Sequence, residues 1–270
     1  MTVYDYIHGI FSGDGKIFRL LNSEKINKRW RNKAFCDLST DDQRKIKSTT
    51  IHAMIFEQKI PENDDTSLYQ VFERINTSGR SLTAQEIRNG VYQGSFNKLL
   101  FELNEIPEWR SVFGKDDSDS RMRDIELILR FFAMKSDSVQ KCTSNQIILK
   151  KTLNEYMGCY VNADETILHN LRNDFITTRQ AINRLIGKNA FRNYNKGKYS
   201  IQFNPALYDA VTIAFYRRIS LGKQLDMANE ERHKALFSNE IFVQACKLRT
   251  TDIVNIKKRI ELAETILFEK

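Results

Sequence analysis

Apolar positions recur at helical spacing over most of this chain, and they predict its main elements. Residues 68–75 carry one apolar face, with charged residues on the other side. A Thr-Ser-Gly stretch follows, and Thr83 with Glu86 then forms the capping-box pattern that starts a helix. The pattern therefore predicts a helix, a tight turn and a second helix across residues 68–89.

From Thr83 onward the pattern is helical with few breaks. Residues 121–134 place four apolar side chains at helical intervals and predict a buried face: Met122, Ile125, Leu129 and Phe132. Asn204 before Pro205 is a strong helix start, because asparagine caps well and proline fits the first turn. Further helix starts are predicted at Ser95, Ser144, Asn162 and Asp252.

Strand patterns are few and lie near the start of the chain. Residues 49–57 are β-branched and apolar and predict a strand, and residues 16–21 predict a shorter one. Thr40 and Gln43 form a further capping-box pattern. Residues 2–11 predict a helix with five side chains on one apolar face: Val3, Tyr4, Ile7, Ile10 and Phe11.

Composition agrees with a folded, mostly helical protein. The 270 residues are 41% hydrophobic and include 3 prolines and 11 glycines, too few for a typical all-β protein. The predicted fold class is α+β, predominantly α-helical. A small α+β domain at residues 1–114 and an all-helical domain at residues 121–270 are divided by the polar loop 115–120.

Charge and residue types narrow the classes of partner. A net charge of +8 favours an acidic partner such as nucleic acid. The four cysteines and four histidines are scattered without the local pairs that zinc sites need, so no metal site is predicted. No apolar run approaches about 18 residues and no signal peptide is evident, so we expect no membrane association and a cytoplasmic location.

The tight turn after residue 75 gathers groups suited to an anion. Free N–H groups at a helix start favour negative charge, and two arginines lie nearby in the sequence. Phosphate binding is one interpretation, and a well-capped corner with solvated arginines is the other. The candidates in and around the turn are Arg74, Asn76, Thr77, Gly79 and Arg80.

Basic residues alternate with aromatic ones in the predicted loop 187–200. This mixture suits contact with a nucleic-acid backbone or with flipped or single-stranded bases. The alternative is an exposed loop pinned by its aromatic residues. The basic run 25–33 around Trp30 leaves the same two interpretations open. The DNA-binding candidates of the predicted loop are Lys188, Arg192, Tyr194, Lys196 and Lys198.

Residues 72–92, FERINTSGRSLTAQEIRNGVY, resemble the Phe-x-Arg-x-Asn-x-x-Gly-x-x-Leu…Glu signature of the GmrSD-type restriction endonuclease N-terminal domain family. Ser78 stands where the family usually has a second glycine. The stretches FNKLLFELNEIPEWR, RMRDIELILRFFAM and FNPALYDAV resemble later helices of the family, so the resemblance covers most of the chain. The matching positions are Phe72, Arg74, Asn76, Gly79, Leu82, Glu86, Ile87, Arg88 and Tyr92.

The resemblance implies the remainder of a small ParB/sulfiredoxin-like domain followed by a helical bundle, and a role in DNA restriction and phage defence. It implies NTP and Mg²⁺ as cofactors of the complete family domain, with Arg88 joining the phosphate-binding candidates in a supporting role and Glu86 mainly capping. The family's Asp-Gly-Gln-Gln-Arg motif, assigned to hydrolysis, does not occur in these residues. We therefore expect a truncated or split protein, inactive alone, that an upstream segment or a second chain completes.

Two other functions stay open at this point. One is a non-catalytic helical module that binds DNA or a protein partner, including a second copy of itself. The other is a gene remnant without independent function. A large exposed apolar surface would indicate either the remnant or a surface for a second chain, because such patches are unusual in soluble monomers.

Overall fold

The computed structural model describes residues 2–10, 16–50, 66–75, 81–115 and 117–269. Its contacts divide the chain into two units, Met1–Phe56 and Glu57–Lys270. Helices make up 62% of the structure, and one two-stranded antiparallel hairpin accompanies them. The predicted fold class, α+β and predominantly α, is therefore confirmed.

The first unit is small and its core is aromatic. It contains the helix α1 (Thr2–His8), the short turn η1 (Phe35–Asp37) and the helix α2 (Thr40–Ser48). Tyr6 is buried and its ring contacts Phe35 edge-on, with the ring centres 5.8 Å apart. The predicted apolar face of this helix was only partly correct, because Val3 and Tyr4 are exposed while Ile7 packs against the cluster around Tyr6.

The predicted strand at residues 16–21 was also wrong. Ile17 forms a single bridge with Ile10, and the backbone of Leu20 pairs with that of Lys33 without a continuous ladder. The strand predicted at residues 49–57 lies almost entirely outside the described residues.

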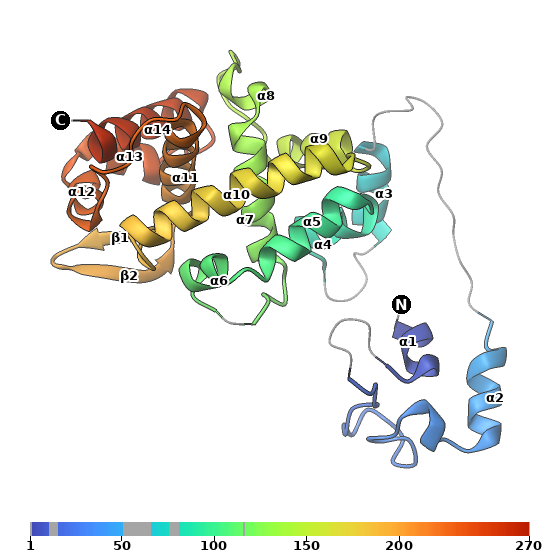
Figure 1. Cartoon of the computed structure of the whole chain (residues 1–270). Helices are drawn as coiled ribbons and strands as arrows, with labels where there is room; N and C mark the ends of the chain where they lie inside the picture. The colour runs from blue at the N-terminus through green and yellow to red at the C-terminus, as the bar shows by residue number, and fades with distance from the viewer. Residues whose placement is uncertain (1, 11–15, 51–65, 76–80, 116, 270) are drawn as a thin grey trace. The chain divides into compact units, whose positions relative to one another are not determined.

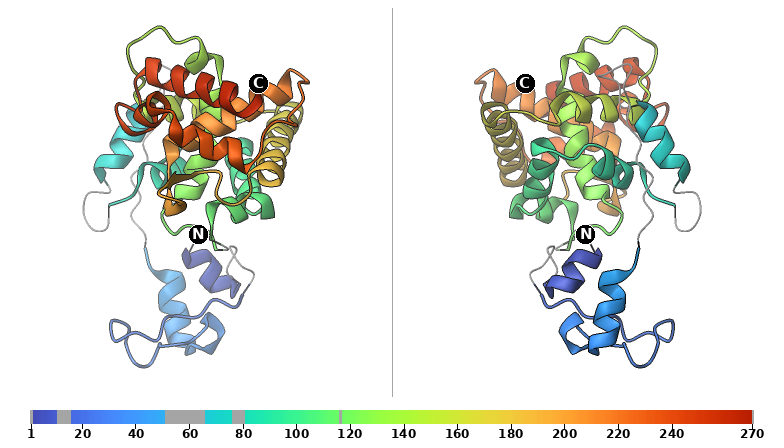
Figure 2. Two further views of the ribbon diagram at one scale, coloured as in Figure 1. Left: turned by 90° about the vertical axis from the view of Figure 1, so that its left-hand side faces the viewer. Right: turned by 90° about the vertical axis from the view of Figure 1, so that its right-hand side faces the viewer.

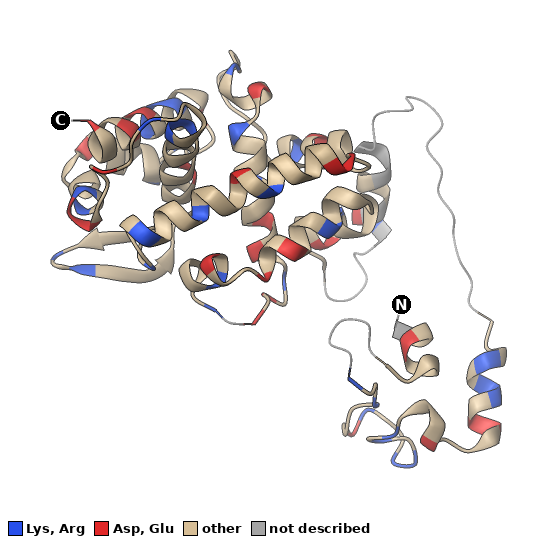
Figure 3. Cartoon of the chain, in the orientation of Figure 1, with Lys and Arg blue, Asp and Glu red and all other residues tan. Residues whose placement is uncertain are grey.

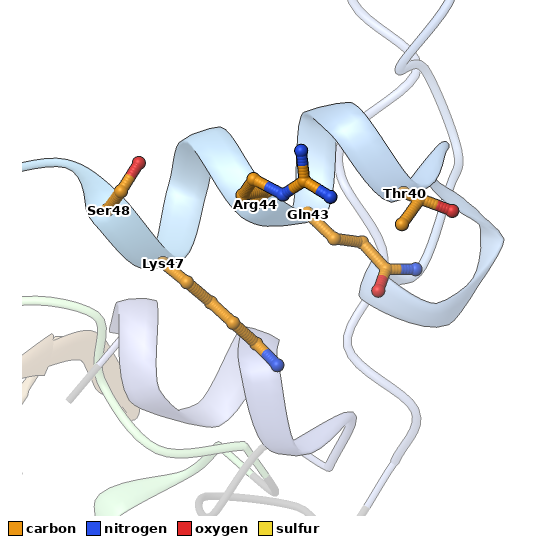
Figure 4. Close-up of a pocket in the computed structure, with 5 residues that line it drawn as sticks. All are labelled: Thr40, Gln43, Arg44, Lys47 and Ser48. Atoms are coloured by element: carbon orange, nitrogen blue, oxygen red, sulfur yellow. The ribbon is translucent and has the colours of Figure 1, made fainter.

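The basic run 25–33 folds into turns held by side chains. The Trp30 indole donates to the Asp42 carboxylate at 3.0 Å, and Arg29 lies over the indole and pairs with the same carboxylate. Helix α2 is capped by Ser39, which accepts from the Asp42 amide, rather than by the predicted Thr40. Figure 4 shows the polar hollow along one face of this helix, lined by Thr40, Gln43, Arg44, Lys47 and Ser48.

The second unit is a stack of helices with one hairpin at residues 192–203 (Figure 1 and Figure 2). Its elements are α3 (Thr66–Ile75), α4 (Ala84–Val91), α5 (Ser95–Asn104), α6 (Pro107–Phe113), α7 (Arg123–Lys135), α8 (Asp137–Gln140), α9 (Leu149–Tyr160), α10 (Glu165–Leu185), β1 (Arg192–Asn195), β2 (Lys198–Phe203), α11 (Pro205–Ser220), α12 (Glu230–Ala235), η2 (Leu236–Ser238), α13 (Glu240–Lys247) and α14 (Ile253–Phe268).

Helices α7 and α11 form the centre of this unit. Apart from the partly exposed Glu126, every residue from Asp124 to Met134 is buried, and so is every residue from Ala206 to Phe215. The loop 115–120, which the sequence suggests as a domain boundary, lies inside this unit. The segment 121–270 is not all-helical, because residues 192–203 form the hairpin where the sequence predicts a loop.

Ion pairs join the central helices from within. Asp209 of α11 binds Arg130 of α7 through two bonds of 2.6 Å and Arg259 of α14 at 2.8 Å. Asp124 similarly pairs with Arg110 of α6 at 2.8 Å. Arg110, Arg130 and Arg259 are all buried between helices, and each of these three guanidinium groups is matched there by a carboxylate.

Local capping signals were partly correct. Thr83 and Glu86 form the predicted capping box, and the Asn204 side chain accepts from the amides of Ala206 and Leu207 before Pro205 continues the helix. Ser95, Ser144 and Asn162 do not cap; the Ser95 hydroxyl instead donates to the Ala163 carbonyl. In the described residues, no helix combines the length and apolar character needed to cross a bilayer.

Candidate nucleic-acid interface

A groove of about 750 Å³ lies in the second unit where α6, the start of α7 and the hairpin meet. Its lining combines apolar and aromatic side chains with basic and neutral polar ones and one acidic side chain. The apolar lining comes from Phe113, Leu127, Tyr199, Ile201, Phe203 and Pro205. The polar lining comes from Ser111, Lys115, Arg123, Glu126, Lys188, Asn189, Arg192, Ser200 and Gln202, with Gly114 between the two sets.

The hairpin owes its tight turn to two residues with left-handed backbone. Lys196 has φ 49° and Gly197 has φ 81°, and the pair Asn195 and Lys198 closes the turn. Positive φ at both central positions matches the right-handed twist of the flanking strands. Lys196 therefore lies in the turn and Lys198 at its closing pair, both exposed. No acidic residue occurs between residues 192 and 203, and the hairpin carries no acidic colour in Figure 3.

A bulge interrupts the hairpin beside the groove. Tyr194 pairs with Tyr199 and Arg192 pairs with Phe203, so residues 200–202 of β2 face the single residue Asn193. The Ser200 hydroxyl donates to the Gln202 carbonyl at 2.9 Å across this irregular stretch. A bulge bends a strand and redirects its side chains. The central residue, Ile201, is 96% exposed.

The hairpin is anchored to α12 through Tyr199, which also lines the groove. The Tyr199 hydroxyl lies 3.2 Å from His233 Nδ1, and His233 Nε2 lies 2.9 Å from the Ala190 carbonyl oxygen. Burial lowers the pKa of His233 to about 4 and raises the pKa of Tyr199 to about 12. Both groups are therefore neutral at pH 7, and the hairpin is held by hydrogen bonds rather than by ion pairs.

Arg192 links the hairpin to the end of α6. Its guanidinium donates to the carbonyls of Val112 and Lys188 at 3.0 and 2.6 Å. Gly114 has φ 84°, and a Cβ there would lie 2.5 Å from an Arg192 nitrogen, so glycine is required at this contact. Burial lowers the pKa of Arg192. In the described part of the chain, this cation meets helix-end carbonyls and no carboxylate.

The groove keeps a positive balance after its ion pairs are counted. Lys115 and Arg123 share the carboxylate of Asp119, at 3.5 and 2.7 Å, and the Arg123 hydrogen bond holds the pKa of that carboxyl well below its usual range. Glu126 is matched by the buried Arg88. Lys188 and Arg192 have no acidic partner among the described residues, which leaves three positive charges.

The predicted DNA-binding residues separate into two groups. Lys188 and Arg192 line the groove, while Tyr194, Lys196 and Lys198 lie on the hairpin outside it. Tyr194 packs against the Tyr199 ring, with the ring centres 4.9 Å apart. Its ring therefore holds the hairpin together, as in the alternative interpretation of a segment pinned by its aromatic residues. Lys196 and Lys198 are exposed.

The sequence missed the residues that α6 and α7 contribute. They are about 65 to 90 positions from the hairpin in sequence, and only the tertiary fold brings them to one groove. The charge of residues 115–123, KDDSDSRMR, gave no signal, because three basic residues are balanced there by three acidic ones. The missed residues that matter most are Phe113, Lys115 and Arg123 near α6 and α7, together with Ser200, Gln202 and Phe203 on the hairpin itself.

The predicted phosphate site is described only at its edges. Arg74 lies exposed in the last turn of α3, and Asn76, Thr77, Gly79 and Arg80 fall outside the described residues.

Arg88 is 1% exposed, and its three nitrogen atoms bond to Gln85, Asn154 and Glu126. This burial and the three bonds argue against direct phosphate contact and for a role in joining α4, α7 and α9.

Neither a metal centre nor a relative adds to this picture. In the described ranges, no three His, Cys, Asp or Glu side chains are close enough to hold a metal ion together. No protein-family model, curated protein or solved structure matches the chain. The resemblance to the GmrSD-type family stays a prediction.

Proposed function

We propose that this chain is a DNA-binding component of a GmrSD-like restriction or phage-defence system, with the groove and the hairpin as its contact face. The link to restriction rests on the motif at residues 72–92. The link to DNA rests on one observation: an aromatic-floored groove keeps three unmatched positive charges beside a hairpin tip that carries two more lysines.

The arrangement fits a polyanion better than a small neutral ligand. Lysines at the hairpin tip are mobile point charges that suit phosphates without demanding one geometry. The neutral groups Ser200, Gln202 and Asn189 offer hydrogen bonds to sugar or base edges. Phe113 and Phe203 form an aromatic floor on which an exposed base can stack.

The proposal assigns no hydrolytic step to this chain. The residues that the family resemblance associates with hydrolysis, Asp-Gly-Gln-Gln-Arg, do not occur in the sequence. NTP and Mg²⁺ therefore belong to the proposal only through the complete family domain. The function proposed for these 270 residues is binding.

Salt-dependent binding tests the proposal directly. Fluorescence anisotropy would follow a labelled DNA duplex titrated with the wild-type chain and with Lys188→Gln/Lys196→Gln/Lys198→Gln. Loss of three phosphate contacts should flatten the slope of log affinity against log salt by roughly 2.7, because each contact contributes about 0.9.

A matched control removes the same charge elsewhere in the second unit. Lys151, Lys223 and Lys247 are exposed and none of them lines the groove. Their combined change to glutamine should leave most of the slope intact. Equal loss in both triple variants would mean that net charge alone drives binding, and unchanged affinity in the groove variant would refute the proposed face.

A second candidate, a protein-interaction module, is favoured by the surface of the first unit. Val3, Tyr4, Ile10, Ile17 and Leu21 are each more than half exposed. Apolar exposure of this kind suits contact with another chain, including a second copy. Light scattering at increasing concentration tests self-association, and Tyr4→Ser with Leu21→Ser should reduce it. A monomer at every concentration would exclude a second copy as the partner.

A further inference from the structure

Ile201 is an apolar side chain presented to solvent by a rigid support. The side chain is 96% exposed, although the residues two positions before and after it in strand β2 are fixed by contacts with other parts of the unit. Phe203, two residues on, packs against Phe191 with the ring centres 5.4 Å apart. Tyr199, two residues before, is bonded to the buried His233. The exposure of Ile201 is therefore a product of ordered structure.

The bulge explains why this side chain points outward. Residues 200–202 occupy the space opposite Asn193, so β2 carries more chain than β1 at this point and arches away from it. The Ser200–Gln202 hydrogen bond closes the arch. Ile201 is at its crest and at the rim of the groove. Bulges commonly redirect a side chain for a purpose, and they need not expose an isoleucine.

The surroundings of Ile201 are suited to nucleic acid. The groove next to it retains positive charge, the hairpin tip adds Lys196 and Lys198, and no acidic residue occurs on the hairpin. Proteins that bend or open DNA insert an isolated apolar side chain between two bases, while basic groups hold the phosphates on either side. An exposed apolar residue between cationic groups has this arrangement.

Resting on the proposed function, we propose that Ile201 is a wedge that enters between adjacent bases of bound DNA and unstacks them. The displaced base then lies toward the aromatic floor formed by Phe113 and Phe203. Lys188 and the hairpin lysines hold the flanking phosphates. The module therefore binds most tightly to DNA that is easily unstacked, such as a mismatched duplex or one with a pyrimidine–purine step.

The test combines two signals from one duplex. A short duplex carrying 2-aminopurine in a central TA step reports unstacking by increased fluorescence, and anisotropy of the same complex reports binding. Wild-type chain should increase both signals. Ile201→Ser should abolish the fluorescence increase while weakening affinity by no more than about 10-fold, since the lost apolar contact and the avoided unstacking oppose each other.

Control variants separate the wedge from general effects. Ile148→Ser removes another exposed isoleucine, 64% exposed and outside the groove, and should keep both signals. Ile201→Leu should keep the fluorescence increase because it preserves an apolar wedge. The circular dichroism spectra of Ile201→Ser, Ile201→Leu and Ile148→Ser should match that of the wild-type chain, because neither Ile201 nor Ile148 is buried.

The outcomes distinguish this inference from the proposed function. Binding by wild-type chain without a fluorescence increase overturns the wedge and leaves DNA binding standing. A fluorescence increase that persists in Ile201→Ser also overturns it, and would leave the side chain free for a protein partner. No binding at all overturns the proposed function and the wedge with it.

Discussion

Arg179 in α10 provides a sharp test of the energetics of this core. Its side chain is 1% exposed, and none of its three nitrogen atoms has a hydrogen-bond partner among the described groups. Five aromatic rings surround the guanidinium at 5.1 to 5.9 Å: Trp109, Phe131, Phe175, Phe191 and Tyr208. We predict that Arg179→Met stabilises the protein.

Two opposing terms decide the sign. Burial lowers the pKa of Arg179 from 12.5 to about 10. The cost of keeping the charge in the folded state is then about 3 kcal/mol at pH 7, because both pKa values lie above that pH and the cost is fully present. Cation–π contact with the rings returns about 2 kcal/mol. Methionine removes the first term, keeps apolar contact with the rings and should raise the unfolding free energy by about 1 kcal/mol.

Urea denaturation followed by circular dichroism measures this change as a shift in the unfolding midpoint at constant slope. Arg184→Met on the same helix is the control, because Arg184 is exposed and its replacement should change stability by less than about 0.5 kcal/mol. A loss of more than about 1 kcal/mol in Arg179→Met would refute the reasoning, since the guanidinium would then contribute more to the fold than its burial costs.

Three further changes have outcomes fixed by local geometry. Asp209→Asn leaves two buried guanidinium groups without a carboxylate and should lower the unfolding free energy by about 3–5 kcal/mol in urea denaturation. His233, with its pKa lowered from 6.5 to about 4, contributes stability that is fully present above pH 6.5 and lost as pH falls towards 4. The free energy of unfolding should therefore decrease by about 3 kcal/mol over that range, and the midpoint temperature of thermal unfolding should fall with it. His233→Gln should make this midpoint depend less on pH. Gly94→Ala places a Cβ 1.9 Å from the Val161 carbonyl oxygen, so thermal unfolding should occur at a lower temperature, with a cost of about 1–3 kcal/mol.

The helices were predictable where their signals are local. The capping box at Thr83 and Glu86 and the Asn204–Pro205 start depend on residues within four positions, and both formed as predicted. Ser144 failed because the chain at residues 145–147 pairs with residues 251–253 instead of starting a helix. That contact spans more than 100 residues, and no local pattern contains it.

The groove was not predictable in the same way. The alternation of Arg192, Tyr194, Tyr199 and Ile201 suits a hairpin, but the turn between them uses Lys196 in place of the usual Asn or Gly and weakened the signal. The sequence identified the basic residues as candidates for DNA contact. Only the fold shows which of them line the groove, which lie at the hairpin tip and which anchor the hairpin. Arg192 illustrates this, because its contacts with helix-end carbonyls come from α6.

The placement of the arginines changes what the net charge of +8 means for DNA binding. Among the described residues of the second unit, three aspartates and five arginines are buried, the arginines being Arg88, Arg110, Arg130, Arg179 and Arg259. These cations serve the core and cannot contact phosphates.

The contact face instead offers three charges in the groove and two at the hairpin tip. Five contacts predict a slope of log affinity against log salt near about −4.5 for duplex DNA. A slope of about −7 or steeper would exceed what this face supplies and would place part of the interface elsewhere, with the basic run 25–33 as the first segment to neutralise.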